Sequence, residues 1–337
     1  MSLCMKEWLA AQNKVARKPV MPILSFPCVQ LMDITVKELI SDSRLQAAGM
    51  KAIADRVPTG MAVSLMDLSV EAECFGATVK FSDDEVPTVV EAVVQDEDDA
   101  AALAVPEVGA CRTGLYIDAV KEAAALITDR PVTAGVIGPF SLAGRLMDVS
   151  EIMVLCYEEP EMVETVLEKC VQFTINYCKA YKEAGANGVV IAEPLAGMLS
   201  PALAEEFSHP YVKQIVDAVQ DDGFAVVYHN CGDNVARMKD GIYGIGAAAY
   251  HFGDAVRLAD MFEGAPADVL VMGNVSPAAQ LLGGTPDSVK AATLAVLQDC
   301  HQYPNFVLSS GCDIPPLSPW ENIDAMFEAA DTFYATV

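Results

Sequence analysis

Two separate stretches of the sequence contain residues that are typical metal ligands. "AVVYHNCGDN" (225–234) carries His229 and Cys231 with one residue between them, and "FVLSSGCDIPP" (306–316) carries Cys312. An imidazole and two thiolates suit zinc, and three protein ligands would leave the fourth tetrahedral position free, as in a catalytic zinc site. The i, i+2 spacing lets His229 and Cys231 point to the same side of extended backbone. The spacing alone leaves open that His229 ends a strand and that the cysteines are buried apolar residues.

These residues stand at the ends of apolar segments that we predict to be strands. Each segment is nearly continuous in apolar residues, which is typical of parallel strands buried on both faces. Longer helical segments separate them, and this alternation of strands and helices favours a (β/α)8 barrel. A doubly wound open sheet is the alternative, but no glycine-rich phosphate turn follows the first strand. The predicted strands are 61–67, 132–138, 188–194, 224–230, 247–253, 269–275 and 306–312, with 21–26 as a possible further strand.

Local sequence signals mark the starts of several helices. Ser200-Pro201 and Thr285-Pro286 each place an N-cap residue before a proline in the first helical position. "SPWE" (318–321) predicts a capping box. The first 60 residues are predicted to be helical and to cover one end of the barrel, and residues 1–337 are predicted to form a single barrel domain.

In barrels of this type the chemistry lies at the carboxyl ends of the strands. Besides the three possible metal ligands, these ends carry carboxylates, a histidine and an amide. We predict that Glu193 and Asp67 are catalytic and that His251, Asp254 and Asn274 bind substrate. The alternative for the carboxylates is that they accept hydrogen bonds from loop amides and hold those loops in place.

The composition restricts the partners and the location. With 47 acidic and 21 basic residues, the chain has a formal charge of −26. Nucleic acid and anionic lipid would be repelled, so small molecules or proteins are the expected partners. The ten cysteines have no regular spacing and are expected to be reduced. No apolar run reaches the ~18 residues of a membrane span and no signal peptide is recognisable, which predicts a cytoplasmic protein.

Several longer motifs resemble the uroporphyrinogen decarboxylase superfamily, and within it the cobamide-dependent methyltransferase branch. They are "LMDLSVEAECFGATVKFSDDEVP", "GVIGPFSLAGRLMDVSE", "IAEPLAGMLSP", "YHNCGDN" and "SSGCDIPPLSPWENIDAMFEAA". They extend from about residue 60 to the C-terminus, and the superfamily fold is the barrel predicted above.

The sequence also departs from the decarboxylases of this superfamily. Those enzymes resemble one another in an R-Q-A-G-R-Y motif whose arginine binds porphyrinogen carboxylates, whereas residues 19–34 of this chain contain no arginine. They carry Gly-His where this chain has Gly311-Cys312, and they lack the His-x-Cys element. We therefore expect that uroporphyrinogen is not the substrate.

The resemblance to the methyltransferase branch implies zinc on His229, Cys231 and Cys312. It implies methyl transfer between a methylated corrinoid (methylcobamide), as co-substrate, and a small thiol such as coenzyme M. Because the sequence contains no D-x-H-x-x-G stretch, the corrinoid is expected on a separate carrier protein. Two alternatives remain: a demethylase component that takes methyl from a methoxylated or methylated substrate, and a metal-free relative of the decarboxylases.

Overall fold

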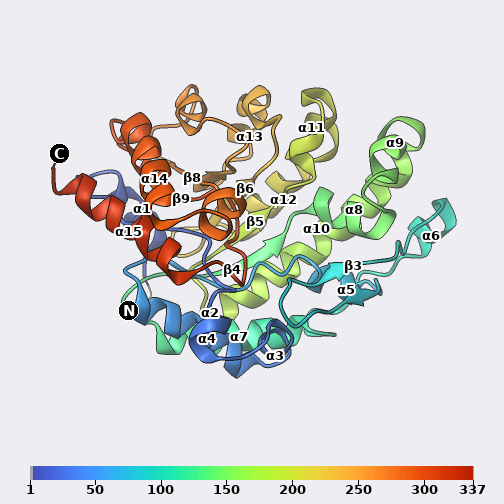
Figure 1. Ribbon diagram of the computed structural model, residues 1–337. Helices are drawn as coiled ribbons and strands as arrows, with labels where there is room; N and C mark the ends of the chain where they lie inside the picture. The colour runs from blue at the N-terminus through green and yellow to red at the C-terminus, as the bar shows by residue number, and fades with distance from the viewer. Residues whose placement is uncertain (1–2, 337) are drawn as a thin grey trace.

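A curled parallel sheet forms the centre of the computed structural model, which describes residues 3–336 (Figure 1). Within these residues the sheet has seven strands in the order β1-β4-β5-β6-β7-β8-β9, and every neighbouring pair is parallel. Each strand thus lies beside the next one in the chain, which excludes the doubly wound alternative. The strands are β1 (Ala62–Val63), β4 (Val132–Ile137), β5 (Gly188–Ala192), β6 (Ala225–Asn230), β7 (Ala249–Phe252), β8 (Leu270–Val275) and β9 (Phe306–Ser310).

An extended segment, residues 20–23, lies between the two edge strands. The Met21 amide donates to the Leu308 carbonyl in β9, and the Gly60 amide, just before β1, donates to the Val20 carbonyl, each at 2.9 Å. Pro22 has no N–H to offer, so a regular ladder cannot form here. The segment therefore takes the eighth place in the barrel without becoming a ladder strand. The predicted (β/α)8 barrel is confirmed, with this difference in its closing strand.

Side chains that alternate along the strands fill the barrel interior. Met21 and Ile23 of the closing segment belong to this inner core together with residues of β1 and β5–β9. The inner residues of the strands are Val63, Val190, Ala192, Ala225, Val227, Ala249, Leu270, Met272 and Val307. The intervening residues, such as Tyr228 and Phe252, point outward and pack against the surrounding helices.

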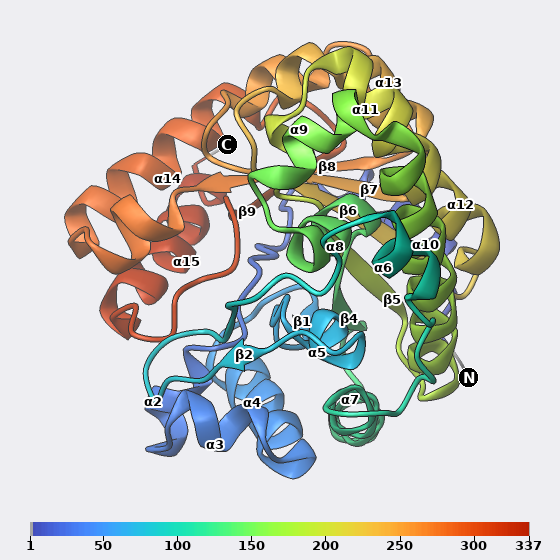
Figure 2. The ribbon, with the colours of Figure 1, turned by 90° about the vertical axis from the view of Figure 1, so that its right-hand side faces the viewer.

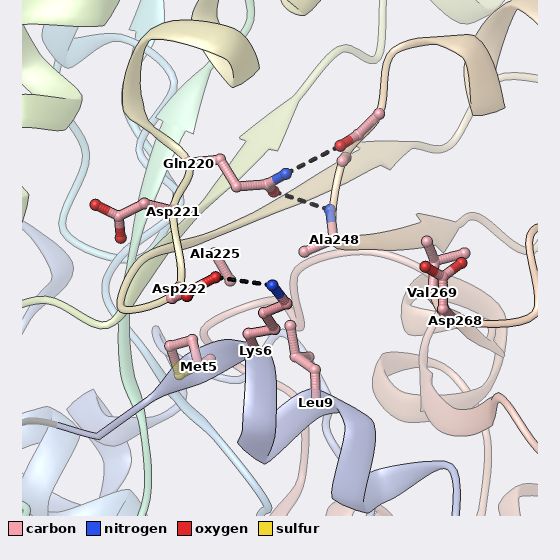
Figure 3. Close-up of a pocket in the computed structure, with 12 residues that line it drawn as sticks. Met5, Lys6, Leu9, Gln220, Asp221, Asp222, Ala225, Ala248, Asp268 and Val269 are labelled. Atoms are coloured by element: carbon pink, nitrogen blue, oxygen red, sulfur yellow. Dashed lines mark hydrogen bonds and ion pairs between the residues drawn. The ribbon is translucent and has the colours of Figure 1, made fainter.

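The amino end of the barrel is covered by α1 (Met5–Gln12), whose Met5 and Leu9 enter the inner core. Lys6 forms an ion pair with Asp222 at 3.1 Å, next to a cavity of about 330 Å³ (Figure 3). This cavity lies where β6, β7 and β8 begin. It is therefore at the opposite end from the residues predicted to do chemistry.

Helices surround the barrel, and two views show their arrangement (Figures 1 and 2). The long α10 (Pro160–Glu183) packs against α8 (Pro139–Met147) and α12 (His209–Val219). The remaining elements are α2 (Cys28–Met32), α3 (Val36–Ile40), α4 (Ser43–Arg56), α5 (Val70–Cys74), α6 (Glu97–Ala102), α7 (Thr113–Leu126), α9 (Glu151–Glu158), η1 (Ala196–Met198), α11 (Pro201–Phe207), η2 (Val235–Arg237), α13 (Lys239–Gly244), η3 (Leu258–Phe262), η4 (Pro277–Leu282), α14 (Pro286–Cys300), α15 (Trp320–Tyr334) and an antiparallel pair, β2 (Val79–Lys80) with β3 (Thr88–Val89).

Two of the three predicted helix starts are confirmed. Ser200 caps α11, and Thr285 caps α14. The predicted capping box at 318–321 is wrong, because α15 begins at Trp320 with Pro319 as its N-cap residue. Among residues 3–336, no helix is both long and apolar enough to cross a membrane.

The closing segment generates a prediction about stability. Ile23 is 3% exposed and points into the barrel, so Ile23→Ala should lower the free energy of unfolding by about 2–5 kcal/mol. Leu31→Ala is the matched control, because Leu31 is 36% exposed and its truncation should change stability by less than about 0.5 kcal/mol. Urea denaturation followed by circular dichroism measures both. Equal effects of the two substitutions would contradict the closing role of the segment.

Candidate metal centre

His229, Cys231 and Cys312 meet at the carboxyl end of the barrel. One ligand atom from each lies within 4.8 Å of the other two, and His229 Nε2 is 3.3 Å from Cys312 Sγ. His229 is the last inward-facing residue of β6, Cys231 follows that strand, and Cys312 follows β9. Two strands that are far apart in the sequence therefore bring together the three residues singled out by their types.

The chemistry and spacing of these side chains fit a zinc ion. Bonds of about 2.0–2.3 Å at tetrahedral angles separate ligand atoms by roughly 3.5–3.8 Å. The distance of 3.3 Å from His229 Nε2 to Cys312 Sγ is close to this separation, and all three ligand atoms lie within 4.8 Å of one another. His229 is buried, while the two cysteines are half-buried. The nitrogen thus forms the floor of the centre, and the sulfur side is accessible from the barrel mouth.

Two glycines allow the loops that carry the cysteines to come so close. A Cβ on Gly253 would lie 2.5 Å from Cys231 Cα, and a Cβ on Gly311 would lie 2.7 Å from Asp254 Oδ1. The loops after β6, β7 and β9 are therefore in direct contact. Any larger side chain at Gly253 must push the Cys231 backbone away.

The two sulfur atoms influence each other electrostatically. A hydrogen bond from Cys312, supported by His229, lowers the pKa of Cys231 well below the ordinary thiol value. The same hydrogen bond and burial raise the pKa of Cys312 well above it. The two cysteines together therefore lose a first proton readily and retain the second. A bound cation would take the place of this second proton.

His251 lies behind His229, away from the cysteines. Its Nδ1 is 2.8 Å from His229 Nδ1, and its Nε2 is 2.7 Å from Ser309 Oγ. Burial lowers the pKa of His251 well below the ordinary histidine value. Both ring nitrogens of His251 thus already have protein partners.

The other two residues predicted to bind substrate differ in their surroundings. Asn274 donates to the carbonyls of Gly253 and Val256 at 2.9 and 2.8 Å, so it holds the loop after β7. Asp254 is exposed and lies against Gly311, the residue before Cys312. Of the two, Asp254 is the one whose carboxylate is open to solvent beside the centre.

Asp67 belongs to a buried polar network after β1. Its carboxylate forms an ion pair with Arg112 and accepts hydrogen bonds from Tyr116 Oη at 2.7 Å and Ser69 Oγ at 2.6 Å. Arg112 also pairs with Glu73 at 2.6 Å. Every charge in this group has a partner within the protein, and the network ties the loop after β1 to α7.

Glu193 points outward from the barrel, toward the first turn of α8. It is fully buried and accepts hydrogen bonds from the amides of Phe140 and Ser141, both at 2.9 Å, and from Ser141 Oγ at 2.7 Å. Burial raises the pKa of Glu193 to about 7, although the hydrogen bonds from these donors act to lower it. These contacts are those of a carboxylate that caps a helix, which was the alternative left open by the sequence.

Sequence reasoning missed Arg112 and Ser309. Arg112 lies in an irregular stretch before α7, far from Asp67 in the chain, and nothing local links the two. Ser309 could have been found from the sequence. It lies two positions after the inward-facing Val307, and residues at positions i and i+2 of a strand lie on the same face.

The chain belongs to the uroporphyrinogen decarboxylase (URO-D) family, whose model matches residues 8–333. It is 31% identical to the methylcobamide:CoM methyltransferase MtbA of Methanosarcina acetivorans, over 79% of this chain and 78% of the relative. It is 28% identical to a uroporphyrinogen decarboxylase of Paraburkholderia phytofirmans, over 80% of this chain and 76% of the relative. The resemblance inferred from the motifs, including that to the methyltransferase branch, is confirmed.

Solved structures agree on the fold. A methyltransferase from Methanosarcina mazei superposes with a TM-score of 0.87 at 23% identity, covering 99% of both chains. A B12-independent methionine synthase from Shewanella superposes with a TM-score of 0.61 at 12% identity, covering 89% of this chain and 90% of that one. At these identities the likeness extends to the fold alone.

The close approach at Gly253 generates a prediction. Gly253→Ala should displace the Cys231 backbone and weaken cobalt(II) binding by roughly ten-fold or more. Gly244→Ala is the matched control, because no atom lies within 4 Å of its added Cβ. Titration of thiolate-to-cobalt absorption bands measures both affinities. Equal cobalt affinity in the two variants would show that the site tolerates the shift.

A second prediction concerns Glu193. In Glu193→Gln the new amide NH₂ faces a backbone N–H that has lost its acceptor, so the free energy of unfolding should fall by about 1–3 kcal/mol. Glu183→Gln, on the exposed side of α10, should change it by less than about 0.5 kcal/mol. Thermal and urea unfolding measure the difference. A Glu193→Gln variant as stable as the parent would argue against the capping role.

Proposed function

We propose that the protein is a zinc-dependent methyltransferase that moves a methyl group between a methylcorrinoid on a separate carrier protein and a thiol such as coenzyme M. The observation that carries the proposal is the meeting of His229, Cys231 and Cys312 within 4.8 Å at the carboxyl end of the barrel. The similarity to methylcobamide:CoM methyltransferases, at 30–31% identity, supports it. We also propose that residues 1–337 act as one barrel domain.

The three side chains would hold the metal, and each has a distinct task. Zinc bound here would lower the pKa of a substrate thiol so that it is available as a thiolate near neutral pH. His229 supplies a neutral nitrogen from the buried floor. Cys231 and Cys312 supply two negative charges that balance the dication and leave the thiol sulfur rich in electrons. The same two residues face the mouth, where a methyl group must arrive.

The walls around the centre would orient the substrate. The loops after β6, β7 and β9 are in contact with one another and fix the positions of both cysteines. Holding the thiol and the methyl donor in a fixed approach reduces the barrier to transfer. Asp254 is exposed next to this centre and is the residue that we propose contacts the far end of the thiol or the incoming donor.

The remaining predicted roles stay predictions. The carboxylates of Asp67 and Glu193 already accept hydrogen bonds or ion pairs from other residues of the protein. A catalytic role of either one would therefore be indirect, through the residues that it contacts. Asn274 would act by keeping the loop that contains Asp254 in place.

Metal analysis and methyl transfer test the proposal together. The purified protein should bind one zinc per chain and transfer methyl from free methylcobalamin to coenzyme M. Cys312→Ser should lose tightly bound zinc and lower the transfer rate by at least about 100-fold, or about 2.7 kcal/mol in the barrier. Cys4→Ser, on the opposite end of the barrel, is the control and should match the parent.

The outcomes separate the alternatives. Methyl transfer to thiols supports the proposal, whereas activity only with methyl ethers or methylamines as donors would assign a demethylase component. Decarboxylation of uroporphyrinogen without metal would identify the protein as a metal-free relative of the decarboxylases. A Cys312→Ser variant that keeps a full equivalent of zinc would refute the ligand set.

A further inference from the structure

We propose that His251 is a positioning residue that, with Ser309, sets the tautomer and the ring orientation of His229. This inference rests on the proposed function, because it concerns the metal ligand. It assigns His251 a task different from the substrate contact predicted from the sequence.

The first step concerns the protons of His229. Its Nε2 faces Cys312 Sγ at 3.3 Å, so Nε2 is the nitrogen on the side of the candidate metal centre. A neutral imidazole that offers Nε2 as a ligand carries its proton on Nδ1. That proton needs an acceptor, because His229 is 1% exposed and water cannot serve.

The second step identifies that acceptor. His251 Nδ1 lies 2.8 Å from His229 Nδ1, whereas the His251 carbonyl is more distant at 3.3 Å. If His251 Nδ1 accepts, then His251 carries its own proton on Nε2. That nitrogen lies 2.7 Å from Ser309 Oγ, which accepts in turn. A serine hydroxyl suits the end of such a chain, because it both accepts and donates.

The third step concerns the surroundings of this chain. His251 is 1% exposed and Ser309 is fully buried, so both hydrogen bonds are closed to solvent. With both nitrogens of His251 engaged, it cannot act as a ligand or contact a substrate without breaking them. Ligand histidines in proteins generally have such a partner on their other nitrogen, and its loss typically weakens metal binding 10- to 100-fold.

The arrangement also accounts for the protein without metal. With the protons shifted, His229 Nε2–H donates to Cys312, His251 Nδ1–H donates to His229, and the Ser309 hydroxyl donates to His251. The number of protons on the three residues is the same in both arrangements. Passing from one arrangement to the other therefore removes the proton from His229 Nε2 and returns one at the Ser309 end of the chain, and the two imidazoles change tautomer together.

The test compares three variants of the full chain by zinc affinity, measured in competition with a chromophoric chelator. His251→Leu removes the acceptor and should weaken zinc binding about 10- to 100-fold. His251→Asn places an amide oxygen close to the position of Nδ1 and should restore most of the affinity. Ser309→Ala removes only the end of the chain and should have a smaller effect than His251→Leu.

Nitrogen-15 spectra of the zinc-loaded parent provide a readout that loss of stability alone would not change. They should show protonated Nδ1 on His229 and protonated Nε2 on His251. Zinc affinity of His251→Leu within two-fold of the parent, failure of His251→Asn to restore it, or a His251 protonated on Nδ1 would each overturn the inference. A parent that binds no zinc would refute the proposed function as well, whereas a parent that binds zinc with an unaffected His251→Leu would refute the inference alone.

Discussion

Alternation of side chains along parallel strands decides what each residue of this site can do. On β6, β7 and β9, the residues that continue the inward-facing row are His229, His251 and Ser309, and they converge inside the barrel mouth. On β5 the inward residues are Val190 and Ala192, so Glu193 must point outward to the helix layer. A change of one residue in the register of β5 would exchange these environments. The direction of each side chain at the strand ends follows from this alternation.

The barrel fold could be predicted because its signal is repeated along the chain, whereas the spacing of the three possible ligands left their role open and the resemblance to the methyltransferase branch implied it. Buried parallel strands are continuous apolar runs. His-x-Cys with a cysteine at another strand end has the residue types of a zinc site, but the same residues can also be buried parts of strand ends. The direction of Glu193 could not be predicted in the same way. Since both faces of each strand are buried, hydrophobicity does not distinguish the inner row from the outer one. The closing segment was visible only as a possible strand, because Pro22 interrupts the pattern of a ladder.

The polar contacts of the site depend on tertiary structure that no local pattern encodes. Arg112 reaches Asp67 from a loop before α7, and the two are separated by 44 intervening residues in the chain. Gly253 and Gly311 carry no functional group, yet they allow the loops after β6, β7 and β9 to touch. The centre thus combines a row of inward residues, which the strands supply, with two sulfur atoms that only close loop packing brings together.

The proximity of Cys231 and Cys312 also makes them a dithiol. Two neighbouring thiols, one with a lowered pKa, are a pair that can form a disulfide once an oxidant is present. Oxidation would therefore remove both candidate sulfur ligands in a single two-electron event, whereas damage to one isolated cysteine would remove only one. Both cysteines are only partly buried, so a small oxidant could reach them. If the centre holds the proposed zinc, its metal occupancy and its redox state are consequently linked.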